Sequence, residues 1–189
     1  ITPLVLSMSF PIMLSMLVQA LYNVVDSLYV SHYSQDALTA LTLAFPLQNL
    51  LIAVSVGTSI GINSLISRKL GAKDTKAANK AAGNGIILSL LSWLLFAIIG
   101  LLFTRRFIGF FTTDAELLRM GHHYSAIVLF FSLGVFIDIT CERILQSTGD
   151  TVRPMIIQMT GAIINIILDP ILIFGLLGAP RMGVVGAAI

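Results

Sequence analysis

Long stretches without any charged residue constrain this chain more than any other feature of its sequence. Four runs contain no Asp, Glu, Lys or Arg: residues 1–25, 37–67, 81–104 and 120–137. A fifth stretch, from Pro154 to Pro180, contains Asp169 as its single charged residue. Each run is close to or above the roughly 20 residues that a helix needs to cross a bilayer. The sequence therefore predicts an all-α membrane protein, built as a polytopic bundle of transmembrane helices.

The composition indicates the same solvent. Hydrophobic residues make up 57% of the chain and charged residues 11%, whereas a soluble domain carries about 25% charged residues. The net charge of +2 gives no reason to expect a nucleic-acid partner. The single cysteine, Cys141, lies within an apolar stretch and cannot form a disulfide framework. The lipid bilayer is therefore the expected environment.

The apolar runs predict five spanning helices and the beginning of another. They lie near residues 4–31, 37–67, 83–104, 121–147 and 154–178, with the start of a sixth at residue 183. The chain lacks an initiator Met, and GVVGAAI stops after one or two helical turns. No basic region precedes the apolar start, so no signal peptide is recognisable. We expect residues 1–189 to be the N-terminal transmembrane lobe of a larger protein whose C-terminal lobe is absent.

Lysine and arginine are distributed unevenly between the two predicted sides of the membrane. One side carries Arg68, Lys69, Lys73, Lys76, Lys80, Arg143 and Arg153, and the other carries Arg105, Arg106, Arg119 and Arg181. Positive residues concentrate on the cytoplasmic side of membrane proteins. We therefore expect a multi-pass protein of the cell (plasma) membrane with its N-terminus in the cytoplasm.

Two aspartates lie inside apolar stretches at matched positions. Asp26 follows Pro11 by fifteen residues, and Asp169 follows Pro154 by fifteen residues. An ionisable residue within the membrane is costly and usually marks a functional site. The first and fifth spans cross in the same direction, and each aspartate lies about 22 Å beyond its proline by helix rise. The spacing predicts one site built from two helices.

Other polar residues share the faces of these two helices. In the first span, Ser15, Gln19, Tyr22 and Asp26 recur at helical steps, with Asn23 beside Tyr22. In the fifth span, Gln158, Asn165 and Asp169 lie on one face. Pro170 frees the carbonyl of Ile166, so oxygen atoms suited to a proton or a hard cation gather beside Asp169. For Gln19 and Asn23, simple hydrogen bonding to neighbouring helices stays an open alternative.

The fourth span adds a further acidic residue. Asp138, Glu142 and Gln146 follow one another at intervals of four residues, which places them on one helix face. Glu142 and Gln146 lie close enough to the cytoplasmic end to reach the interface. Asp138 lies deeper, and we expect it to face a water-filled substrate cavity.

Four segments resemble the N-terminal half of multidrug and toxic compound extrusion (MATE) transporters. They are QALYNVVDSLYVS, GTSIGINSLISRKLGAKD, LQSTGDTVRPM and NIILDPILIFGLLGAPRMGVVGAAI, in this order along the chain. The resemblance implies two six-helix lobes around a cavity and transport by alternating access. The expected function is a cation-coupled (Na⁺ or H⁺) antiporter that exports amphipathic, cationic drug-like molecules.

The resemblance also implies roles for individual residues. Asp26, Asn165 and Asp169 would couple transport to the cation, and they would be metal ligands only if that cation is Na⁺. Gln19 and Tyr22 would line the substrate cavity, where we also expect Asn23 and Asp138. No tightly bound cofactor is implied, and the chain is not expected to be an enzyme. The resemblance further implies that a sixth-helix residue beyond Ile189 completes this cation site, and that the second lobe is absent from the sequence.

Three other classes compete with the antiporter. A flippase of lipid-linked substrates belongs to the same superfamily, but flippases favour cationic cavities, which the acidic stripes argue against. An intramembrane aspartyl protease would also use two carboxylates, yet Tyr22 and Asp26 are not adjacent, and STGD at 147–150 has Ser where the protease motif has Gly. A channel or structural membrane protein would pass ions without a substrate, or pass none.

Overall fold

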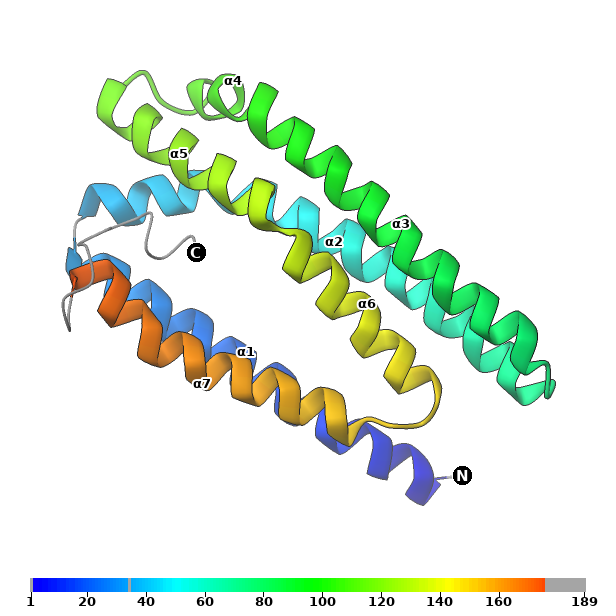
Figure 1. The fold of residues 1–189 in the computed structure, drawn as a ribbon. Helices are drawn as coiled ribbons and strands as arrows, with labels where there is room; N and C mark the ends of the chain where they lie inside the picture. The colour runs from blue at the N-terminus through cyan, green and yellow to red at the C-terminus, as the bar shows by residue number, and fades with distance from the viewer. Residues whose placement is uncertain (1, 34, 176–189) are drawn as a thin grey trace.

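The computed structural model describes residues 2–33 and 35–175, and within them it contains α-helices and no strand (Figure 1). The helices are α1 (Thr2–Tyr33), α2 (Gln35–Gly71), α3 (Thr75–Leu102), α4 (Thr104–Gly109), α5 (Ala115–Phe131), α6 (Leu133–Ser147) and α7 (Val152–Phe174). The predicted all-α class is confirmed. The helix start predicted at residue 183 lies outside the described residues.

Four of the described helices are long and apolar enough to cross a bilayer. Their candidate spans are Leu6–Tyr29, Leu41–Gly71, Thr75–Leu102 and Val152–Phe174. α5 and α6 form a further candidate as a pair bent by 44°, so the structure divides the span predicted over 121–147. Ser132 stands at the bend, and its hydroxyl donates to the carbonyl of Leu129 at 2.7 Å. Bonds of this kind often accompany a bend in a helix.

The helices form two groups. α1 packs chiefly against α7, whereas α2 packs against α3, α5 and α6. Figure 1 shows α1 and α7 side by side, with α5 and α6 between them and α3. The buried side chains of Leu47, Leu51, Phe96, Leu129 and Phe136 join the larger group. Contacts between α6 and α7 are few, so the interface of the two groups is where cavities are expected.

Close helix packing occurs at glycines of α3. A Cβ built at Gly100 would lie 2.8 Å from the Cβ of Leu129, and one built at Gly85 would lie 2.9 Å from Ile62. Gly57 and Gly61 form the GxxxG pattern from which the sequence predicts close packing. No described atom outside their own helix backbone lies within 4 Å of a Cβ built at either residue. That prediction is wrong for the part of the lobe described.

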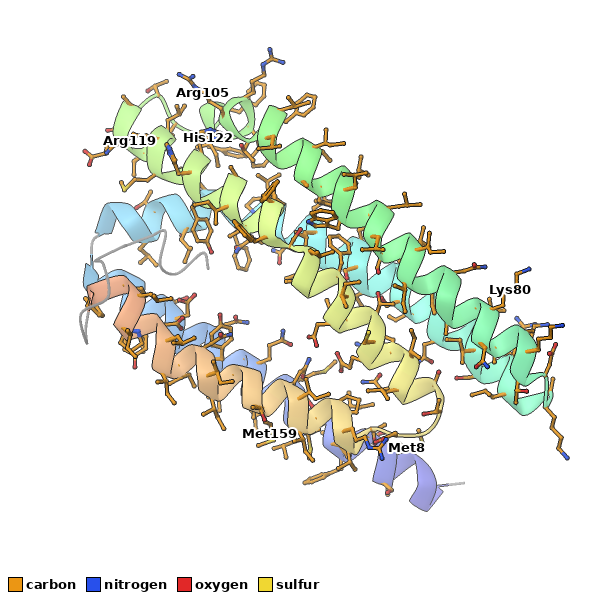
Figure 2. The ribbon with its side chains drawn as sticks, viewed as in Figure 1. Met8, Lys80, Arg105, Arg119, His122 and Met159 are labelled. Atoms are coloured by element: carbon orange, nitrogen blue, oxygen red, sulfur yellow. The ribbon has the colours of Figure 1, made fainter. Side chains whose placement is uncertain are left out.

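The two ends of the bundle carry different features. The N-terminus, the α2–α3 turn and the α6–α7 turn lie together at one end, and α4 lies at the other (Figure 1). We call the first the basic end, because it carries Arg68, Lys69, Lys73, Lys76, Lys80 and Arg153. Figure 2 shows Lys80 at this end and Arg105 and Arg119 at the opposite end. The basic end is the one that the sequence places in the cytoplasm.

Candidate functional site

Asp26 of α1 and Asp169 of α7 lie within electrostatic range of one another. The two helices pack against each other and make up the smaller helix group. Both begin at the basic end (Figure 1). The Asp169 side chain is buried, with 8% of its surface exposed, and Asp26 is half-buried. The charge of Asp169 acts on Asp26, so the carboxylates lie within electrostatic range of one another. The structure therefore brings together the two aspartates that the sequence paired by their spacing.

Tyr22 and Asn165 lie beside the two carboxylates. Tyr22 is half-buried and lies within interaction range of Asn165 and of both aspartates. Tyr22 precedes Asp26 by four residues, and Asn165 precedes Asp169 by four residues. This shared spacing puts each polar residue one helical turn toward the basic end from its aspartate. The four side chains form one polar group, which we call the acidic pair site.

Two residues of the larger helix group lie beside the acidic pair site. The sequence did not identify either of them as a site residue. Tyr124 of α5 is 4% exposed, and its hydroxyl accepts a hydrogen bond from Gln48 Nε2 of α2 at 2.9 Å. Tyr124 also lies within electrostatic range of Asp26 and Asp169. The uncharged run 120–137 contains no other tyrosine, so a search for polar groups in spans would have found it. The acidic pair site therefore reaches across from α1 and α7 toward α2 and α5.

One oxygen of each aspartate has no partner among the described residues. Asp26 Oδ1 and Asp169 Oδ2 are buried, and neither accepts a hydrogen bond from that part of the chain. The ion pairs among the described residues join Lys69 to Asp74 and Arg153 to Asp150, both at the basic end. A buried carboxylate without a counter-charge is unfavourable, and a proton or a bound cation relieves that cost. The unpartnered oxygens and the nearby amide and phenol groups suit such a positive charge.

The other predicted residues of the first span lie outside the acidic pair site. Gln19 and Asn23 are exposed on the lobe. Ser15 is buried and turns back onto its own helix, where its hydroxyl donates to the carbonyl of Pro11 at 2.9 Å. A role in a substrate cavity for Gln19 and Asn23 stays a prediction.

Asp138 lies in a different place from the acidic pair site. It lines a cavity of about 40 Å³ together with Glu142 of α6 and Gln158 of α7. The Glu142 carboxylate accepts hydrogen bonds from Gln146 Nε2 at 2.8 Å and Gln158 Nε2 at 3.4 Å. Across the described residues, no three His, Cys, Asp or Glu side chains gather as a metal site. Asp138 therefore belongs to a second polar group that joins α6 to α7.

Apolar helices of spanning length around a buried acidic pair define a polytopic membrane protein. The chain belongs to the MATE family, since the MatE family model matches residues 11–171. Related proteins include the probable multidrug resistance protein YoeA of Bacillus subtilis, with 28% identity over 94% of this chain. The multidrug export protein MepA of Staphylococcus haemolyticus is 30% identical over 96% of this chain. The FAD transporter of Shewanella oneidensis is 26% identical over 97%.

Solved structures of the family share the fold. A MOP superfamily transporter from Pyrococcus furiosus matches 98% of this chain with a TM-score of 0.91 and 32% sequence identity. A multidrug resistance MATE transporter in an outward-facing conformation matches with the same TM-score and identity. This chain spans 40% of each of those structures and 39% to 41% of the three related proteins. The likeness therefore covers fewer than half of the residues in each relative.

Proposed function

We propose that this chain forms the N-terminal lobe of a cation-coupled antiporter that exports amphipathic, cationic compounds by alternating access. The observation that carries the proposal is the pair formed by Asp26 and Asp169, each with a buried oxygen to which none of the described residues donates a hydrogen bond. Membership of the MATE family supports the transport function. The names of the B. subtilis and S. haemolyticus relatives, a multidrug resistance protein and a multidrug export protein, support a drug-like cargo.

The acidic pair site would serve two positive ligands in turn. A proton or Na⁺ bound to the pair neutralises the charge that would otherwise attract a cationic substrate. A bound cationic substrate likewise neutralises the charge that would otherwise attract the coupling ion. Asn165 and Tyr22 would add oxygen atoms to the site, and Na⁺ accepts such hard ligands. Because one negative site holds both ligands poorly at the same time, each would expel the other. This exclusion is what exchange across a membrane requires.

The position of the pair along the helices suggests the route of the coupling ion. Asp26 and Asp169 lie about 22 Å beyond Pro11 and Pro154 by helix rise, and both helices begin at the basic end. With that end in the cytoplasm of the cell, the carboxylates lie in the outer half of the membrane. A cation would reach them from outside and be released inward after the lobes change their orientation.

Ethidium efflux by the full-length protein tests the proposal, with sodium and pH gradients imposed separately. We expect Asp26→Asn and Asp169→Asn to abolish efflux while expression stays normal. Asp150→Asn is a matched control, because Asp150 lies at the basic end in an ion pair with Arg153 at 3.2 Å. Normal efflux by both site variants would remove the assignment. Which gradient supports efflux in the wild type would identify the coupling ion.

A further inference from the structure

A second cavity lies at the basic end, away from the acidic pair site. Its volume is about 270 Å³, and it opens between α1, α2 and α6. The lining includes Met8 and Ile12 of α1, Ile60 and Asn63 of α2, and Arg143 and Gln146 of α6. Figure 2 shows Met8 beside the C-terminal end of α6. The cavity therefore combines an apolar wall with one positive charge.

Arg143 differs from every other described arginine, because the rest are exposed and it is half-buried. Its Nη1 donates to Gln146 Oε1 at 2.6 Å, and its Nε is buried with no acceptor in the part of the chain that the structure describes. Among the described residues, no ion pair joins Arg143 to a carboxylate. The two ion pairs found there involve Lys69 and Arg153. A buried guanidinium donor without a partner is unfavourable and is suited to an anion.

Neighbouring groups fix the part of α6 that carries Arg143, a lining residue of this cavity. Asn63 Nδ2 donates to the backbone carbonyl of Arg143 at 2.8 Å, which fixes the end of α6 against α2. Gln146 accepts from Arg143 and donates to Glu142, and Glu142 accepts in turn from Gln158 of α7. The Glu142 carboxylate is thus engaged on the α7 side, where it lines the smaller cavity with Asp138. Arg143 lies within electrostatic range of Glu142 and also lines the larger cavity.

We propose that the cavity at Arg143 binds a phosphate group, with the headgroup of an anionic phospholipid as its main source. A guanidinium offers parallel N–H donors that match phosphate oxygens. Met8, Ile12 and Ile60 provide apolar contacts for the glycerol and the first part of the acyl chains. The basic end supplies the surrounding positive charge that draws anionic lipid. A phosphate there would join α1 to α2 and α6, which belong to different helix groups. The site goes beyond the proposed function and does not depend on cation coupling.

Lipid binding to the purified full-length protein tests this site. Thermal unfolding is followed in detergent while phosphatidylglycerol or phosphatidylcholine is titrated into the micelles, and a separate titration uses inorganic phosphate against chloride at equal ionic strength. We expect phosphatidylglycerol to stabilise the wild type more than phosphatidylcholine does. Arg143→Gln should weaken the apparent affinity for phosphatidylglycerol about tenfold or more, since it removes a charge-assisted hydrogen-bond donor. Arg143→Lys should recover part of the loss.

Arg153→Gln is the matched control. Arg153 lies at the same end of the bundle, but its side chain is 77% exposed and pairs with Asp150. An equal loss of affinity in Arg153→Gln and Arg143→Gln would mean general surface attraction and would overturn the proposal. So would an Arg143→Gln protein that responds like the wild type. Stabilisation by inorganic phosphate that needs Arg143, without a preference for phosphatidylglycerol, would support the phosphate site but make free phosphate its source.

A measurement on the unmutated protein covers the case in which Arg143→Gln does not fold. A phosphatidylglycerol analogue with a photoreactive group beside its headgroup is crosslinked to the full-length wild type, and the modified peptides are identified by mass spectrometry. We expect adducts on α1 near Met8 and Ile12 and on α2 near Ile60, with an excess of unlabelled phosphatidylglycerol reducing them. Adducts spread evenly over the basic end, or absent from these segments, would overturn the proposal.

Discussion

Removing the charge of Asp169 should make the ligand-free protein more stable at the same time as it destroys function. Asp169 is 8% exposed, and its Oδ2 is buried with no donor from residues 2–33 and 35–175. Leaving a buried polar or charged atom unsatisfied costs about 1–3 kcal/mol. Asp169→Asn keeps the shape of the side chain and removes a charge that lies within electrostatic range of Asp26. We expect a gain of about 1–2 kcal/mol in the free energy of unfolding.

The assay is thermal unfolding of the full-length protein in detergent, with choline replacing sodium so that no metal cation fills the site. A gain of this size raises the midpoint by a few degrees. The control Asp150→Asn removes an exposed ion pair and should change stability by less than about 1 kcal/mol. If sodium is the coupling ion, adding it should stabilise the wild type and leave Asp169→Asn unchanged. A midpoint that falls clearly below that of the control variant would refute the reasoning, because it would mean that Asp169 has donors to lose.

Two further predictions concern packing and the far side of the acidic pair site. Gly100→Ala should destabilise the full-length protein by about 1–3 kcal/mol in chemical unfolding, since a Cβ there would lie 2.8 Å from Leu129. Gly57→Ala meets no described atom within 4 Å, so it should leave stability unchanged or raise it by up to about 1 kcal/mol; equal losses in both would contradict the packing described. Tyr124→Phe removes the hydroxyl that accepts from Gln48, costs about 1 kcal/mol and should reduce ethidium efflux without changing expression. Unchanged efflux would exclude Tyr124 from the site.

The spans and the pairing of the two aspartates could be predicted because both depend on features along single helices. A run without charges has one stable outcome in a bilayer, because a helix satisfies its own backbone hydrogen bonds. The fifteen-residue spacing from Pro11 to Asp26 and from Pro154 to Asp169 indicates a common depth. Because α1 and α7 begin at the same end and pack together, two aspartates at the same depth on these helices lie near each other.

The remaining features depend on which helices are neighbours, and helical periodicity does not show that. Tyr124 and Gln48 come from α5 and α2, so only the packing of the two helix groups brings them beside the acidic pair site. Asp138 is acidic like the two aspartates of that site, but its position on α6 places it at the smaller cavity, which Glu142 also lines.

Small residues show the same limit. Gly57 and Gly61 match a helix-packing pattern, yet the close contacts occur at Gly85 and Gly100, which belong to no pattern that we recognised. Ser132 stands at the bend between α5 and α6 and donates to the carbonyl of Leu129, and Ser89 makes the same kind of bond inside the continuous helix α3. Serine occurs in many unbent parts of this chain, so its presence alone does not predict a bend.

Competition between two positive ligands is the most direct measure of the central claim. Ethidium binding to the purified full-length protein is titrated at several sodium concentrations and at several pH values. We expect the apparent affinity for ethidium to fall as the coupling cation increases, and the dependence to disappear in Asp26→Asn and Asp169→Asn. An affinity for ethidium that stays constant across every sodium concentration and pH in the wild type would contradict the account.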